Sequence, residues 1–69
     1  MKGLALGSLR VGSKYKLTNF GEVNEFVIER ALGNGDFAVK DLLTLERYKL
    51  KELFNYGKGK DFEITEIYD

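Results

Sequence analysis

The stretch FVIERALGNGDFAVK, residues 26–40, decides the fold, because it has the pattern of two strands joined by a tight turn. Its centre, Asn34-Gly35, supplies the positive φ angles that a two-residue hairpin turn requires. Folding the chain about this dipeptide brings three pairs opposite one another: Leu32 and Phe37, Arg30 and Val39, and Glu29 and Lys40. The stretch is therefore predicted to be a hairpin with a shared core face, made of Phe26, Ile28, Leu32, Phe37 and Val39.

One further strand is predicted on each side of this hairpin. Residues 14–19 (KYKLTN) alternate polar and apolar side chains, which places Tyr15 and Leu17 on the core face, and residues 20–22 follow as a turn. Residues 61–65 (DFEIT) alternate in the same way after a glycine-containing break, which places Phe62 and Ile64 on the core face. Both stretches fit an antiparallel sheet with one apolar face.

Residues 42–56 (LLTLERYKLKELFNY) allow two interpretations. Asp41 as an N-cap, Gly57 as a C-cap and the good helix formers between them are typical of a helix near residues 43–56, packed on a small antiparallel sheet. Against this α+β alternative, the apolar residues spread over more than half of the helical wheel. A turn at residues 43–44 instead gives a second hairpin with a continuous core face, in which Val39 pairs with Tyr48 and Phe37 with Leu50. We favour this hairpin, followed by a short helical turn over residues 51–56.

The order of these elements resembles an SH3-like barrel. The run Leu9-Arg10-Val11-Gly12 is followed by Tyr15-Lys16-Leu17, a long bent hairpin, a second hairpin, one short turn and a final strand. The predicted fold class is therefore all-β: a small SH3-like barrel of about five strands, with a short helical turn before the last strand, in a single domain over residues 1–69.

Two shorter runs, DFAVKDLLTL at residues 36–45 and YGKGKDF at residues 56–62, resemble those of short bacterial proteins with such a barrel. That resemblance implies a fold and no activity. Peptide-binding SH3 domains grip proline-rich ligands with a Trp and a Pro-Tyr element, and this chain has no Trp and no Pro. Recognition of proline-rich peptides is therefore not expected.

The composition excludes several classes of function. Histidine and cysteine are both absent, which removes the commonest general base, disulfides and thiolate metal sites, so we expect no enzyme, no cofactor and no metal. The formal net charge is zero, without the basic excess that nucleic-acid binding usually requires. The N-terminal apolar stretch is interrupted by Gly3, Gly7 and Ser8, so no leader or membrane span is expected, and we expect a cytoplasmic protein.

The candidate binding residues form three groups. Lys40, Arg47 and Lys49 fall on one outer face of the second hairpin, and this basic stripe is suited to phosphates or an acidic protein surface. Tyr56, Lys58 and Lys60 lie in an exposed glycine-containing loop, and Phe54 with Tyr56 forms an aromatic patch. A solvated strand face, and a loop shaped by its glycines, explain the same residues without a ligand.

We draw three hypotheses from these groups. The first is a non-enzymatic interaction module, whose partner is another protein bound along a barrel edge or over the aromatic patch near Phe54 and Tyr56. The second is a nucleic-acid-binding barrel that uses the five cations Lys40, Arg47, Lys49, Lys58 and Lys60. The third is a structural or oligomer-forming domain, in which an exposed strand edge pairs with a second copy. The sequence alone leaves the partner and the oligomeric state open.

Overall fold

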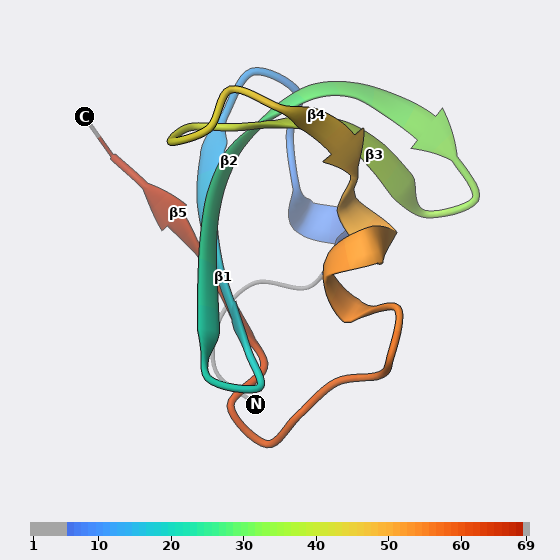
Figure 1. Cartoon of the computed structure of the whole chain (residues 1–69). Helices are drawn as coiled ribbons and strands as arrows, with labels where there is room; N and C mark the ends of the chain where they lie inside the picture. Colours follow the sequence, from blue (N-terminus) through green and yellow to red (C-terminus); the bar gives the residue numbers. More distant parts are fainter. Residues whose placement is uncertain (1–5, 69) are drawn as a thin grey trace.

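Five antiparallel strands form one curved sheet in the order β4-β3-β2-β1-β5 (Figure 1). The computed structural model describes residues 6–68; residues 1–5 and 69 lie outside this description, and so does part of the N-terminal stretch that is expected to be neither a leader nor a membrane span. The elements follow the chain as η1 (Leu6–Ser8), β1 (Lys14–Asn19), β2 (Glu22–Gly33), β3 (Asp36–Asp41), β4 (Arg47–Lys49), η2 (Leu50–Phe54) and β5 (Glu63–Ile67). The all-β prediction is confirmed, since the helical elements η1 and η2 are short 3-10 turns.

The long strand β2 joins the two halves of the sheet, and its register with β3 corrects the sequence prediction. The predicted pairs of Arg30 with Val39 and of Glu29 with Lys40 are wrong, because β2 is bulged between Ile28 and Arg30 and again between Ala31 and Gly33. Val39 therefore lies opposite Ile28. Leu32 is likewise not the partner of Phe37, which pairs with Ala31. Each bulge adds a residue to one strand and increases its twist, which curls the sheet over its apolar face.

The core fills the concave side of this sheet. Tyr15 and Leu17 of β1 are buried there as predicted, and the rings of Tyr15 and Phe26 lie 6.3 Å apart, centroid to centroid. The buried apolar residues are Leu9, Tyr15, Leu17, Phe26, Ile28, Val39, Leu50 and Ile64. The Tyr15 hydroxyl accepts a hydrogen bond from the Arg10 backbone N–H at 2.9 Å, so this buried polar group is satisfied.

The second hairpin is confirmed and the helix alternative over residues 43–56 is wrong. Val39 lies opposite Tyr48, as the turn at residues 43–44 predicts. The predicted pair of Phe37 with Leu50 is wrong, because the chain leaves the sheet at Lys49 and Leu50 begins η2, where it is fully buried. Burying Leu50 beneath the sheet is the physical reason for the early end of β4.

The last strand lies two residues further along the chain than predicted. Ile64 is buried as expected, whereas Phe62 precedes β5 and packs half-buried against the core. Strand β5 pairs with β1, at the opposite edge of the sheet from β4. Within residues 6–68 no ladder joins β4 to β5, so the sheet is open rather than closed into a barrel.

Candidate functional site

The β1–β2 turn is a tight turn held by a carboxylate from elsewhere in the chain. Phe20 and Gly21 both have positive φ, at 51° and 77°, which is the geometry of a twisted two-residue hairpin turn. Their backbone N–H groups donate to Asp61, at 2.8 Å to Oδ1 and 2.7 Å to Oδ2. Asp61 was predicted to lie in the last strand, but it instead fixes this turn against the loop before β5.

Asn19 fastens the same loop to the end of β1. Its side chain is 4% exposed, and Nδ2 donates to the carbonyl oxygens of Leu53 at 3.3 Å and Gly57 at 3.0 Å. Its Oδ1 accepts the Gly59 N–H at 2.7 Å. The amide thus satisfies three backbone groups where η2 ends, and loops held in this way are suited to presenting binding residues.

Two aromatic rings stand exposed on this fixed frame. Phe20 is 60% exposed and Tyr56 is 94% exposed, although a chain of this size needs most of its rings in the core. Both rings line one hollow between the β1–β2 turn and η2. We call this hollow the aromatic groove; it is lined by Asn19, Phe20, Glu22, Asn24, Glu52, Leu53 and Tyr56.

Gly59 lets the loop lie close against Phe20. A Cβ at this position would stand 2.9 Å from Phe20 Cδ1 and 3.0 Å from Asp61 Oδ1, both closer than ordinary contact distances. The loop before β5 therefore supports one side of the Phe20 ring.

The aromatic groove is acidic. Glu22 and Glu52 lie on its rim, and a neighbouring hollow that shares Asn24 is lined by Val23, Glu25, Asp41, Leu43 and Thr44. Among the described residues, neither hollow is lined by a Lys or an Arg. Glu22 and Glu52 therefore make the groove itself favourable to a cationic ligand.

The predicted loop and aromatic residues lie on different surfaces of the structure. Tyr56 lines the aromatic groove, whereas Lys58 places its Nζ 5.0 Å from the ring centroid of Phe62 and 5.6 Å from that of Phe54, within cation–π range. Phe54 and Phe62 pack edge to face at 5.7 Å. Lys60 lies with Lys58 in a different hollow, lined by Thr18 and residues 58–63. The predicted patch of Phe54 with Tyr56 is thus not a single surface.

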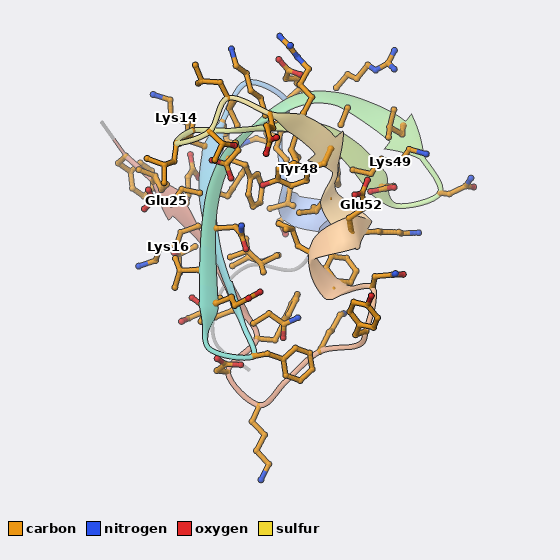
Figure 2. The ribbon with its side chains drawn as sticks, viewed as in Figure 1. Lys14, Lys16, Glu25, Tyr48, Lys49 and Glu52 are labelled. Atoms are coloured by element: carbon orange, nitrogen blue, oxygen red, sulfur yellow. The ribbon has the colours of Figure 1, made fainter. Side chains whose placement is uncertain are left out.

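The predicted basic stripe lies on the convex face of the sheet. Lys40 is opposite Arg47, and Lys49 follows Arg47 by two residues on β4, so all three project to the same side. Figure 2 shows Lys14, Lys16 and Glu25 on the side of β1 and β2 turned away from η2. Arg47 donates from Nε to Glu29 Oε1 at 2.9 Å. Lys51, two residues beyond Lys49, points elsewhere, because its Nζ donates to the Asn34 carbonyl oxygen at 2.8 Å.

Asp41 and Tyr48 form a separate polar pair beneath the β3–β4 loop. The backbone N–H groups of Thr44 and Leu43 donate to Asp41 Oδ1 and hold the pKa of this carboxyl below its ordinary value. Burial, followed by the negative charge of Asp41, raises the pKa of Tyr48 to about 12. The Tyr48 hydroxyl donates to Asp41 Oδ2 at 3.4 Å. These contacts shape the loop.

Acid is expected to destabilise the fold through Asp41 and Asp61. The backbone N–H groups of Gly21 and Phe20 lower the pKa of Asp61, as those of Thr44 and Leu43 lower the pKa of Asp41. A lowered folded-state pKa adds stability above the unfolded value of about 4, and this stability is lost as the pH falls through the folded-state pKa. Urea unfolding should give a constant free energy between about pH 7 and pH 5 and a decrease below about pH 4.

Asp61→Asn provides the control for this pH dependence. The variant cannot titrate at residue 61, so its loss of stability in acid should be shallower than that of the original chain. Identical acid profiles for the two proteins would contradict the assignment of Asp61 to the turn.

Sequence reasoning missed Asn19, Phe20, Glu22 and Glu52 as site residues. Asn19 ends a predicted strand and Phe20 begins the turn predicted at residues 20–22, where polar and exposed residues are ordinary. The contacts that reveal them join residues up to 41 positions apart in the chain. The available signal was the large ring of Phe20 beside Gly21 in a predicted turn, where Gly, Asn, Asp and Ser are the usual residues.

A comparison of the chain with protein-family models, with curated proteins and with solved structures gave no match. Over residues 6–68 no helix has the length and apolar character needed to cross a membrane. In the same part of the chain, acidic side chains do not gather into a group able to hold a metal ion. Function therefore has to be inferred from the geometry and charge of the surface.

Proposed function

We propose that the chain is a non-enzymatic module that binds a short segment of another protein in the aromatic groove. The observation that carries this proposal is the exposure of Phe20 and Tyr56 on one hollow, within loops held by Asn19 and Asp61. Exposed rings on a rigid frame bury large apolar area at little cost in conformational entropy. Such rings are the usual centres of binding energy at protein interfaces.

The charge of the groove supports a basic partner. Glu22 and Glu52 line the groove together with the two rings. A segment with one apolar side chain next to a Lys or Arg would place the apolar group between the rings and the cation at the acidic rim. The absence of Trp and Pro from the chain agrees with a ligand that is not proline-rich.

The order of the strands supports an SH3-like scaffold in which the sheet is open. The strand order β4-β3-β2-β1-β5, the bulged β2 shared by both halves of the sheet, and the 3-10 turn before the last strand favour this topology. The groove lies where the β1–β2 turn approaches η2. Since fold alone does not define a ligand, the proposal rests on the groove residues.

The test is selection of peptides from a random library on the immobilised domain, followed by anisotropy measurements with the enriched peptides. Enriched sequences should combine an apolar residue with a neighbouring Lys or Arg. Tyr56→Ser should weaken their binding about tenfold or more, since a central ring is removed. Glu22→Gln together with Glu52→Gln should weaken binding and reduce its dependence on salt.

Tyr68→Ser is the matched control for Tyr56→Ser. Tyr68 is 81% exposed and does not line the groove, so its replacement should change affinity less than about twofold. Enrichment of acidic peptides, or an equal loss of affinity in the two tyrosine variants, would reject the proposed site.

A further inference from the structure

The first bulge of β2 creates a basic hollow on the convex face of the sheet. Because the bulge lies between Ile28 and Arg30, Arg30 is the partner of Ala38, where the predicted register had set it opposite Val39 on the core face. Lys49 is the partner of Ala38 on the other side. The short side chain of Ala38 is therefore flanked by two long cations on neighbouring strands.

Arg47 adds a third cation to the same hollow. The lining residues are Glu29, Arg30, Leu32, Ala38, Arg47, Tyr48 and Lys49, and we call this the basic hollow. The one carboxylate among them, Glu29, accepts the Nε–H of Arg47 at 2.9 Å. That contact orients the guanidinium, whose side chain is still 67% exposed and whose terminal amino groups remain as further donors.

We propose that the basic hollow is a second binding site, distinct from the aromatic groove, and that it takes an extended acidic segment of a protein. Arg47 and Lys49 project from alternate positions of β4, so they stand about 6.6 Å apart along the strand. Alternate carboxylates of an extended peptide have the same spacing. Arg30 and Lys49 bind such a carboxylate from both sides above Ala38, and guanidinium–carboxylate pairs are the strong, directional kind.

The position of the exposed rings favours an acidic peptide over nucleic acid. The strongly exposed rings among the described residues, Phe20, Tyr56 and Tyr68, all lie outside the hollow, and Tyr48 packs its ring against the core. Single-stranded nucleic acid therefore lacks a stacking platform here.

The backbone N–H of Lys49 donates to Glu52 Oε2 at 3.2 Å, at the junction of β4 and η2 (Figure 2). Because this backbone donor is already occupied, the peptide is bound by the side chains of the hollow.

The test uses a fluorescent peptide of alternating Glu and Val residues, measured by anisotropy at low and at physiological ionic strength. Binding should be seen at low salt and should weaken as salt is added. Arg30→Gln combined with Lys49→Gln should lower the affinity about tenfold. In amide NMR spectra, the peptide should shift resonances of residues 29–40 and 47–49 and leave those of residues 19–24 and 52–56 in place.

Lys16→Gln combined with Lys60→Gln is the matched control. It removes the same charge from exposed positions outside the hollow, so affinity should fall less than about twofold. Circular dichroism of both double variants checks that they fold. An equal loss in the two double variants, tighter binding of an oligothymidylate with the same number of charges, or no binding at low salt would overturn the proposal.

Discussion

Replacing Asn19 by alanine is expected to lower the free energy of unfolding by about 3 kcal/mol, the cost of leaving several buried polar groups without partners. The side chain joins the end of β1 to the carbonyl oxygens of Leu53 and Gly57 and to the N–H of Gly59. Alanine removes all three hydrogen bonds at a site that is almost completely buried. Urea unfolding followed by circular dichroism measures the change.

Two further variants separate the hydrogen bonds of Asn19 from its shape. Asn19→Asp keeps an acceptor for the Gly59 N–H but turns a carboxylate toward two carbonyl oxygens, so it should destabilise the fold at least as much as alanine. Asn55→Ala alters an exposed position after η2 and should change the free energy of unfolding by less than about 0.5 kcal/mol. Equal effects of Asn19→Ala and Asn55→Ala would mean that Asn19 does not hold the loop.

Replacing Phe26 by alanine is expected to cost about 4 kcal/mol, which is typical of a large ring removed from a core. Phe26 is fully buried at the point where β2 has partners on both sides, Tyr15 of β1 and Asp41 of β3. At about 0.05–0.15 kcal/mol per residue, the total stability of so short a chain is about 3.5–10 kcal/mol, so this substitution removes a large part of it. The midpoint of urea unfolding, followed by the strand signal in circular dichroism, should therefore fall to a much lower urea concentration.

Phe20→Ala is the matched control for Phe26→Ala, because it removes the same side chain from an exposed position. It should change the free energy of unfolding by no more than an ordinary surface substitution does, about 0.5 kcal/mol. If both phenylalanine variants unfold at the same urea concentration, the assignment of Phe26 to the core is wrong.

The parts of the fold that local chemistry controls were predictable from the sequence. The Asn34-Gly35 turn, the inward side chains of Tyr15 and Leu17, and the pair of Val39 with Tyr48 all follow from a turn and a period of two. The register of β2 with β3 was not predictable in this way, because an alternating pattern does not show where a bulge lies. The one departure from the pattern was Arg30, which the unbulged register places on an apolar face.

A candidate site was predictable from the sequence when its residues lie close together in the chain. Lys40, Arg47 and Lys49 were brought together correctly, since only a short hairpin separates them. The aromatic groove depends instead on hydrogen bonds of Asn19 and Asp61 with residues far away in the chain, and no sequence pattern predicts such contacts. Arg30 lines the basic hollow because the bulge makes it the partner of Ala38, and the sequence did not predict that bulge.

The hydrogen bond from the Lys49 N–H to Glu52 has a consequence for polymerisation. An open sheet can grow into a fibre only if both of its outer strands accept another chain. In β4, which has three residues, Glu52 occupies a donor that an incoming strand would need. This contact hinders strand addition at this border of the sheet. Pairing with a second copy would therefore be easier at β5, the opposite border of the sheet.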